Sequence, residues 1–282
     1  MIASAFEVSG LAGPLDWSIA GGLFGLLIGS FLNVCISRLP YDESVVTPRS
    51  HCPRCGAWIA WYDNIPLLSY VLLGGKCRAC GAGIAWRYPA VEALTGGLFW
   101  LAVSVHGPTL AGLKWSLFAA ILIALIFTDL ETRILPDEFT KGGMVAGFLL
   151  APVVPLPPGL LRIFWPQATP ELISLLDSLF AAGLLAGGLW LLALLYLRLR
   201  GREGLGFGDV KMLGVLGAFL GLESSLLVML LASLLGSVLG LMWVKLRNED
   251  MSSYELPFGA FLGAAGLVVA FAGASLFTWP PG

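Results

Sequence analysis

Charge is scarce in this chain. Only 12% of its 282 residues are Asp, Glu, Lys or Arg, and soluble domains usually carry about twice that proportion. Hydrophobic residues make up 57% of the chain and are gathered in long runs. The composition therefore excludes an ordinary soluble enzyme and predicts an all-α membrane protein that crosses the bilayer several times.

Basic residues are missing from the N-terminal stretch, because no Lys or Arg precedes Arg38. A cleavable signal peptide begins with a positively charged segment. We therefore expect no cleavable signal peptide here, and we predict that the first apolar run remains in the protein as a helix.

Eight apolar segments are predicted to span the membrane. They cover residues 17–37, 89–106, 110–129, 136–154, 172–198, 208–222, 224–246 and 256–279. The sixth is short for a complete span, and the stretch 155–170, which contains Pro and Trp, is predicted to be an interfacial loop. The chain thus divides into an N-terminal region with the first span (1–37), a polar loop domain (38–88) and a bundle of the other spans (89–282).

Lys and Arg predict the orientation of these spans, because they collect on the cytoplasmic side of a membrane. With the N-terminus outside, the loops 38–88, 130–135, 199–207 and 247–255 face the cytoplasm. Fourteen of the sixteen basic residues then lie in or beside these loops, and only Lys114 and Arg162 fall on the other side. The reversed topology would invert that count.

Four of the five cysteines form two CxxC pairs in the polar loop, at Cys52 and Cys55 and at Cys77 and Cys80. Each pair can present two thiolates to one tetrahedral ion, and a glycine follows each pair, which suits a tight turn. A reducing cytosol disfavours disulfides. The pattern predicts a structural zinc ion that stabilises a small cytoplasmic domain between the first two spans. The fifth cysteine, Cys35, is predicted to be an inert packing residue.

Two acidic residues stand at the edges of apolar segments, Asp129 at the end of the third and Asp209 at the start of the sixth. The predicted topology places both at the cytoplasmic face. Two carboxyl groups held close together share a proton unequally, so that one acts as a base and the other as an acid. The placement indicates an aspartic peptidase dyad, with Gly206 and Gly208 allowing the backbone to bend before Asp209.

Other interpretations of these acids remain open. Each aspartate can be an interfacial helix cap. Asp137 is predicted to be such a cap or a partner of the helix dipole, and Glu131 can be a solvated surface group. Glu92, one turn into the second span, requires a partner. Intramembrane acids also serve ion- or proton-coupled transporters, and a membrane-tethered zinc module that only binds a partner would explain the cysteines alone.

Several motifs carry a resemblance to a known family. They are Gly29-Ser30-Phe31-Leu32-Asn33-Val34, Arg38-Leu39-Pro40, the two CxxC pairs, Tyr62-Asp63-Asn64-Ile65-Pro66, Arg87-Tyr88-Pro89-Ala90-Val91-Glu92, Leu135-Pro136-Asp137 and Gly206-Phe207-Gly208-Asp209-Val210-Lys211. In this order they resemble the bifunctional type IV prepilin peptidases, which are GxGD-type membrane aspartic proteases of type IV pilus and type II secretion systems. The resemblance covers nearly the whole chain.

The resemblance implies a bacterial inner-membrane enzyme that acts at the cytoplasmic face. It would cut the basic leader from type IV prepilins or pseudopilins, with Asp129 and Asp209 as the catalytic pair. It would then methylate the new N-terminal residue with S-adenosylmethionine, an activity that the family associates with the cysteine loop. Presenilin-like proteases share only the GxGD motif and lack the cysteine pairs. No glycine fingerprint locates the methyl-donor site, and nothing in the sequence indicates nucleic acid as a partner.

Overall fold

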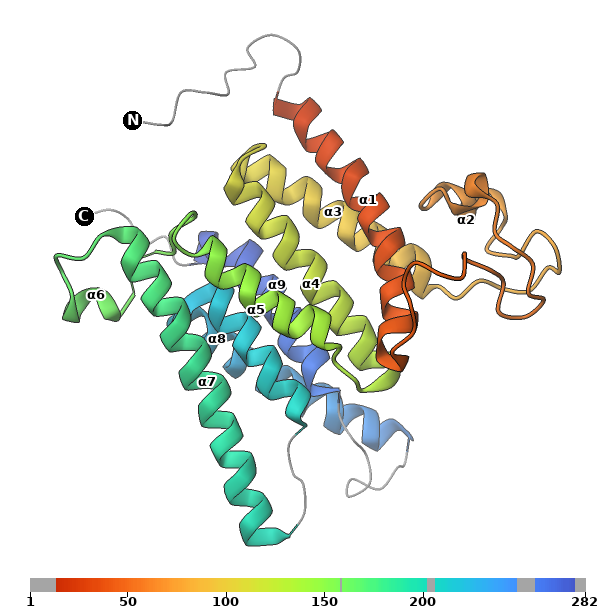
Figure 1. Ribbon diagram of the computed structural model, residues 1–282. Coiled ribbons are helices and arrows are strands. Elements are labelled where there is room, and N and C mark those ends of the chain that lie inside the picture. Colours follow the sequence, from red (N-terminus) through yellow and green to blue (C-terminus); the bar gives the residue numbers. More distant parts are fainter. Residues whose placement is uncertain (1–13, 158, 202–205, 248–256, 277–282) are drawn as a thin grey trace.

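The computed structural model describes residues 14–157, 159–201, 206–247 and 257–276 of the chain, and these residues are mainly helical (Figure 1). The long helices are α1 (Pro14–Arg38), α3 (Arg87–His106), α4 (Leu110–Thr132), α5 (Asp137–Leu150), α7 (Pro170–Arg200), α8 (Phe207–Arg247) and α9 (Phe258–Leu276). The short ones are η1 (Leu39–Tyr41), η2 (Trp61–Asn64), α2 (Leu68–Leu72) and α6 (Leu161–Phe164).

The long helices coincide with the predicted membrane segments. Five of the helices described are long and apolar enough to cross a membrane, namely those within Leu15–Tyr41, Arg87–His106, Leu110–Thr132, Pro170–Arg200 and Phe207–Gly240. The predicted fourth span is wrong in length, because α5 ends at Leu150 after 14 residues. The predicted sixth and seventh spans correspond to the two helical segments of α8, which are separated by a kink at Gly221. The count of eight spans stays a prediction.

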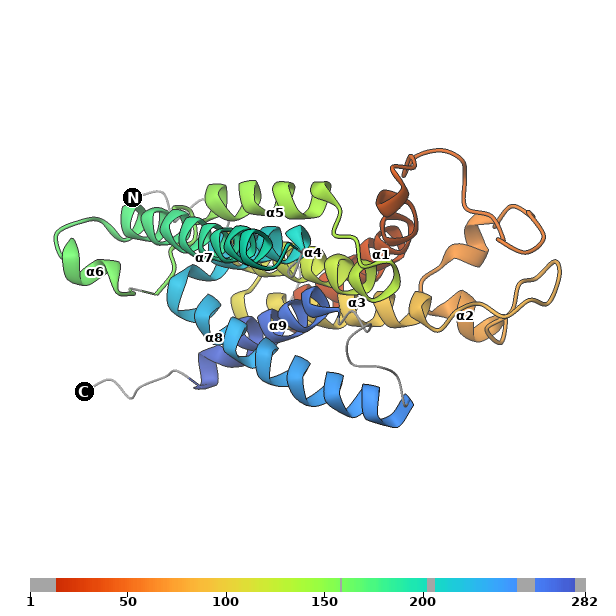
Figure 2. The same cartoon turned by 90° about the horizontal axis from the view of Figure 1, so that it is seen from below.

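Helix α4 lies at the centre of the bundle. Seen from below, α5 and the second half of α8 lie on opposite sides of α4 (Figure 2). Its side chains join two apolar cores, one shared with α8 and α9 and the other with α1 and α3. The rings of Phe118 on α4 and Phe219 on α8 pack with their centroids 4.8 Å apart. Because α4 belongs to both cores, the two halves of the bundle pack as one body.

Small residues allow several helix pairs to approach closely, as their abundance in the apolar runs indicates. A methyl group on Gly25 of α1 would lie 2.6 Å from Cβ of Phe99 on α3. One on Gly217 of α8 would lie 2.5 Å from the backbone nitrogen of Ala182 on α7. The backbones of these helices are therefore in near contact.

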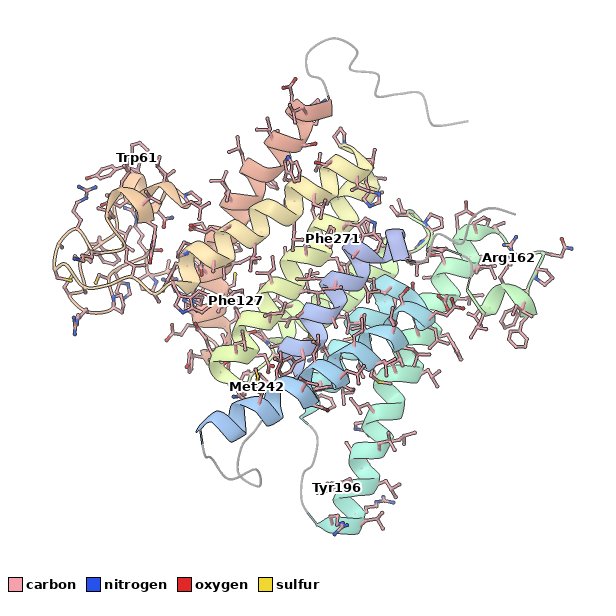
Figure 3. The ribbon with its side chains drawn as sticks, turned by 180° about the vertical axis from the view of Figure 1, so that it is seen from behind. Trp61, Phe127, Arg162, Tyr196, Met242 and Phe271 are labelled. Carbon is pink, nitrogen blue, oxygen red and sulfur yellow. The ribbon has the colours of Figure 1, made fainter. Side chains whose placement is uncertain are left out.

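Two basic residues, Lys114 and Arg162, lie at the end of the bundle opposite the cysteine loop. They are the two that the predicted topology places on the side away from the cytoplasm. Trp61 in the loop and Arg162 in α6 mark the two ends (Figure 3). The guanidinium of Arg162 donates to the carbonyl of Ala168 at 2.8 Å, within the stretch that was predicted to be a loop. Lys114 is fully buried and donates to the carbonyl of Val154 at 3.0 Å. Backbone carbonyls thus satisfy both cations locally.

The interruption of α8 lies against a buried acid, Asp177. Gly221 has a φ of 73°, a conformation that favours glycine, and the buried carboxylate of Asp177 on α7 accepts a hydrogen bond from the N–H of Leu222. A methyl group on Gly221 would collide with that carboxylate. The first helical segment therefore ends at Gly221. A second segment, 222–247, begins next to the carboxylate of Asp177.

The close approach of α7 and α8 leads to a stability prediction. Gly217→Ala should destabilise the bundle by about 1–3 kcal/mol, because overpacking forces the backbones apart. Gly187→Ala on α7 is the matched control, since a methyl group there meets nothing within 4 Å, and it should stabilise α7 by about 0.5–1 kcal/mol. Thermal unfolding of the detergent-solubilised proteins measures both. Equal melting temperatures for the two variants would contradict this account of the helix contact.

Candidate functional site

The two predicted aspartates lie at the same end of the bundle, around Leu135. Asp129 occupies the last turn of α4 with 6% of its surface exposed, and Asp209 occupies the first turn of α8 and is half-buried. A methyl group on Gly208, beside Asp209, would lie 3.1 Å from Cδ1 of Leu135, and one on Gly259 would lie 3.3 Å from the same atom. Leu135 therefore lies near both the carboxylate of Asp129 and the segment that carries Asp209.

The N-terminus of α9 completes this site. The N–H of Ala260 donates to Oδ2 of Asp129 at 2.7 Å, and a methyl group on Gly259 would lie 3.1 Å from the same oxygen. A carboxylate at a helix N-terminus is stabilised by free N–H groups and by the helix dipole. Sequence reasoning missed Gly259 and Ala260. Pro257, directly before an apolar glycine-rich run, was the available signal for a helix start here.

Asp137 has a partly different environment from the predicted one. The residue preceding α5 is Pro136, and no side chain caps that helix, so Asp137 is not a cap, but it lies in the first turn of α5, where the helix dipole favours a negative charge as predicted. Its carboxylate also forms ion pairs with Lys211 of α8 at 2.6 Å and with Lys141, one turn on, at 2.7 Å. Lys211 follows Asp209 by two residues, so Asp137 ties the start of α8 to the start of α5.

The four loop cysteines form a cluster. The sulfur atoms of Cys52, Cys55, Cys77 and Cys80 all lie within 4.8 Å of one another, and this is the spatial arrangement that a tetrahedral four-thiolate metal site requires. Cys35 is separate from this cluster and is buried in the bundle at 3% exposure, as a packing residue is.

The two cysteine pairs have nearly the same backbone geometry. In each, the N–H of the following glycine donates to the carbonyl of the first cysteine at 2.9 Å, and Gly56 and Gly81 have φ values of 71° and 70°. A side chain would be strained at both glycines. The N–H groups of Cys55 and Arg54 lower the pKa of the Cys52 thiol to about 6. The N–H groups of the first turn thus point at the sulfur of Cys52, which favours the thiolate that binds metals.

Glu92 attaches the cysteine loop to α3. Its carboxylate is 9% exposed and accepts the N–H of Leu67 at 2.8 Å, which supplies the partner that this acid was predicted to need. Inside the loop, Asp63 and Arg78 form a two-point ion pair at 2.6 and 2.8 Å, and this pairing lowers the pKa of Asp63. The loop is therefore anchored to the bundle and braced internally.

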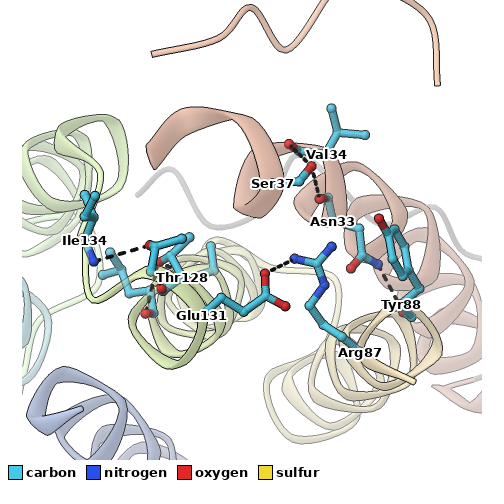
Figure 4. Close-up of polar contacts among 11 residues, drawn as sticks. Asn33, Val34, Ser37, Arg87, Tyr88, Thr128, Glu131 and Ile134 are labelled. Carbon is cyan, nitrogen blue, oxygen red and sulfur yellow. Dashed lines mark hydrogen bonds and ion pairs between the residues drawn. The ribbon is translucent and has the colours of Figure 1, made fainter. Parts of the chain in front are cut away.

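Glu131 is exposed, as expected of a surface group, and it is also paired. Its carboxylate accepts a hydrogen bond from Arg87 at 2.6 Å, and Arg87 is 7% exposed (Figure 4). The pair joins the end of α4 to the start of α3. It also lines a cavity of 1330 Å³ between the cysteine loop and the ends of α1, α3 and α4.

Comparisons with known proteins match both halves of the chain. Residues 23–106 match the model of the bacterial peptidase A24 N-terminal domain, and residues 116–241 match that of the type IV leader peptidase family. A prepilin leader peptidase/N-methyltransferase of Aeromonas hydrophila is 38% identical over 91% of both chains. Its namesake in Myxococcus xanthus is 40% identical over 84% of this chain, a match that spans 65% of the relative.

The chain belongs to the prepilin leader peptidase/N-methyltransferase family. In this family member, the match to the leader peptidase model contains both Asp129 and Asp209, and the match to the N-terminal model contains all four cysteines of the loop. A namesake in Pseudomonas aeruginosa is 35% identical over 90% of both chains. No solved structure matches significantly, and the comparisons give the transporter interpretation no support.

Proposed function

We propose that this membrane enzyme cleaves the leader peptide of type IV prepilins or pseudopilins and then methylates the new N-terminal residue with S-adenosylmethionine. The observation that carries the proposal is the placement of Asp129 and Asp209 at one end of the bundle, around Leu135, in a chain whose relatives carry both activities in their names. The proposed setting is the bacterial inner membrane, crossed eight times, with both acids at the cytoplasmic face.

The contacts of the two acids support a division of their roles in cleavage. The N–H of Ala260 donates to Asp129, which lies at the N-terminus of α9. Both the hydrogen bond and the helix dipole favour the charged form of this carboxylate. Asp129 therefore takes a proton from the attacking water, and Asp209 is the member that carries a proton and hydrogen-bonds to the scissile carbonyl. The water oxygen bonds to the carbonyl carbon, and the C–N bond then breaks as the leaving amine takes a proton.

The cysteine loop, 38–88, is proposed to fold around one structural zinc ion. Four sulfurs within 4.8 Å of one another fit that ion, and all four ligand positions are filled by the protein. When bound, the ion would supply most of the folding energy of a loop with little apolar core. We associate this loop with methyl transfer and the bundle 89–282 with cleavage.

Removing either carboxylate should stop cleavage. Asp129→Asn and Asp209→Asn each remove one partner of a general acid–base pair, so the cleavage rate should fall by about 100-fold or more. Mass spectrometry of a prepilin incubated with each purified variant measures leader loss. The matched control is Glu138→Gln, which removes an exposed acid at the start of α5 and should retain most of the activity. A folded Asp209→Asn protein that cleaves at the normal rate would overturn the dyad.

Displacing Asp129 without removing it should also impair cleavage. In Gly259→Ala the added methyl group lies 3.1 Å from the carboxylate, so the carboxylate must shift, and a shift of about 1 Å can lower a rate roughly 100-fold. Gly142→Ala on α5 is the control, since a methyl group there meets nothing within 4 Å. The same cleavage assay and a melting curve separate lost geometry from lost folding. Unchanged cleavage by Gly259→Ala would show that the N-terminus of α9 does not position the site.

Replacing cysteines should separate the two activities. The Cys77→Ser, Cys80→Ser double variant should lose the roughly one equivalent of zinc expected for the wild type and unfold the loop, because the loop depends on the ion. Methyl transfer should then fail, while cleavage falls less. Metal analysis and mass spectrometry of the product, with and without S-adenosylmethionine, measure these effects. If both activities fall in step in a folded bundle, the loop is part of the peptidase site.

A further inference from the structure

The cavity beside the cysteine loop is large enough for two ligands. Its volume is 1330 Å³, whereas a pocket for one small molecule usually measures about 300–1,000 Å³. Its walls come from the end of α1, from the loop, from the start of α3 and, through Glu131, from the end of α4. A site that brings a methyl donor to a peptide N-terminus requires room of this kind.

Aromatic rings and carboxylates line this cavity together. Trp58, Tyr62 and Tyr88 contribute rings, and each is at least 37% exposed. Asp63 and Glu131 contribute carboxylates. Aromatic faces stack on adenine and attract cations, and S-adenosylmethionine carries an adenine, a sulfonium and an α-ammonium group. The lining therefore matches both ends of that molecule.

Two buried polar side chains in the cavity lining have atoms without hydrogen-bond partners in the described part of the chain, which is a second, independent observation. Asn33 and Arg87 are 3% and 7% exposed, and both line the cavity. Among the residues described, Oδ1 of Asn33 and Nε of Arg87 have no hydrogen-bond partner, although such buried groups normally have one. Their side chains lie next to each other in Figure 4. The guanidinium remains protonated at any physiological pH, so it has a donor to spare for a carboxylate such as that of the methionine moiety.

We propose that this cavity binds S-adenosylmethionine, with its adenine against Tyr62 and its carboxylate at Arg87, and that Glu131 meets the α-amino group of the processed prepilin. This assignment rests on the proposed function and gives its second activity a location. Glu131 follows Asp129 by two residues on α4, so the peptidase site and the cavity lie on different sides of the same helical turn. A helix is about 10 Å wide, and the new N-terminus therefore moves by only about that distance between the two reactions.

Glu131 accepts the proton that must leave the α-ammonium group before the methyl group is transferred. The α-ammonium group first gives a proton to this carboxylate, and from there the proton passes to solvent. The freed amine nitrogen then forms a bond to the methyl carbon. The sulfur–carbon bond breaks and leaves its electron pair on sulfur, which yields S-adenosylhomocysteine and a methylated ammonium group.

Binding of S-adenosylhomocysteine tests the location without requiring turnover. The probe is titrated into full-length protein in lipid nanodiscs, and the leader loss and methyl increment of a prepilin are scored separately by mass spectrometry. Tyr62→Ala should weaken binding of the probe by about tenfold, the effect of losing one base–aromatic stack. Tyr62→Phe keeps the ring and should restore binding. Tyr41→Ala, an exposed tyrosine outside the cavity lining, should bind as the wild type does.

Glu131→Gln tests the second half of the proposal. The amide can still accept from Arg87, so binding of the probe and leader cleavage should stay within about twofold of the wild type, while the turnover number for methyl transfer falls about 100-fold. Glu138→Gln, an exposed acid on α5, is the control and should leave methyl transfer unchanged. A Glu131→Gln protein that methylates normally would overturn the assigned role of this acid.

Three outcomes distinguish failure of the proposed donor site from failure of the proposed methyltransferase function. Unchanged binding of the probe by Tyr62→Ala would overturn the donor site. Unchanged binding together with a raised KM for cleavage would also overturn it and would assign the cavity to the basic leader peptide. If the wild-type protein cleaves prepilin but neither binds the probe nor methylates, the proposed methyltransferase function itself fails.

Discussion

Three carboxylates buried in this apolar bundle each accept a backbone N–H, and the arrangement of the chain depends on these hydrogen bonds. Asp129 accepts from Ala260, Glu92 from Leu67 and Asp177 from Leu222. A buried carboxylate without a partner is unfavourable by several kcal/mol, so each bond restricts where the donor segment can pack. Together they fix the start of α9 on α4, the cysteine loop on α3 and the second half of α8 on α7.

The central position of α4 follows from the same constraint. One side of its last turn holds Asp129 against α9, and Glu131, two residues on, pairs with Arg87 at the wall of the loop cavity. Arg133, in a left-handed conformation with a φ of 59°, ends the helix directly after this turn. A single turn of helix thus contributes an acid to each of the two sites, and the packing of α4 in both apolar cores holds that turn in place.

Much of this arrangement could be predicted from the sequence, because apolar run length and cysteine spacing are local properties. They predicted the long helices and the grouping of Cys52 with Cys77, and the glycines after each pair predicted the turns. The partners of the acids could not be predicted, because each donor lies far along the chain: Ala260 follows Asp129 by 131 positions. The ion pair of Asp137 could not be predicted for a related reason, since its partner Lys211 lies on another helix.

The break at Gly221 divides the macrodipole of α8 into two. The segments 207–220 and 222–247 each have a partial positive charge at the start and a partial negative charge at the end. Asp209 lies in the first turn of one segment, and Asp177 meets the start of the other. A continuous helix would present only one positive end, and Asp177 would face N–H groups already bonded within the helix. Gly221 therefore adds a second positive helix end, which meets Asp177 at the end of the bundle opposite Asp209.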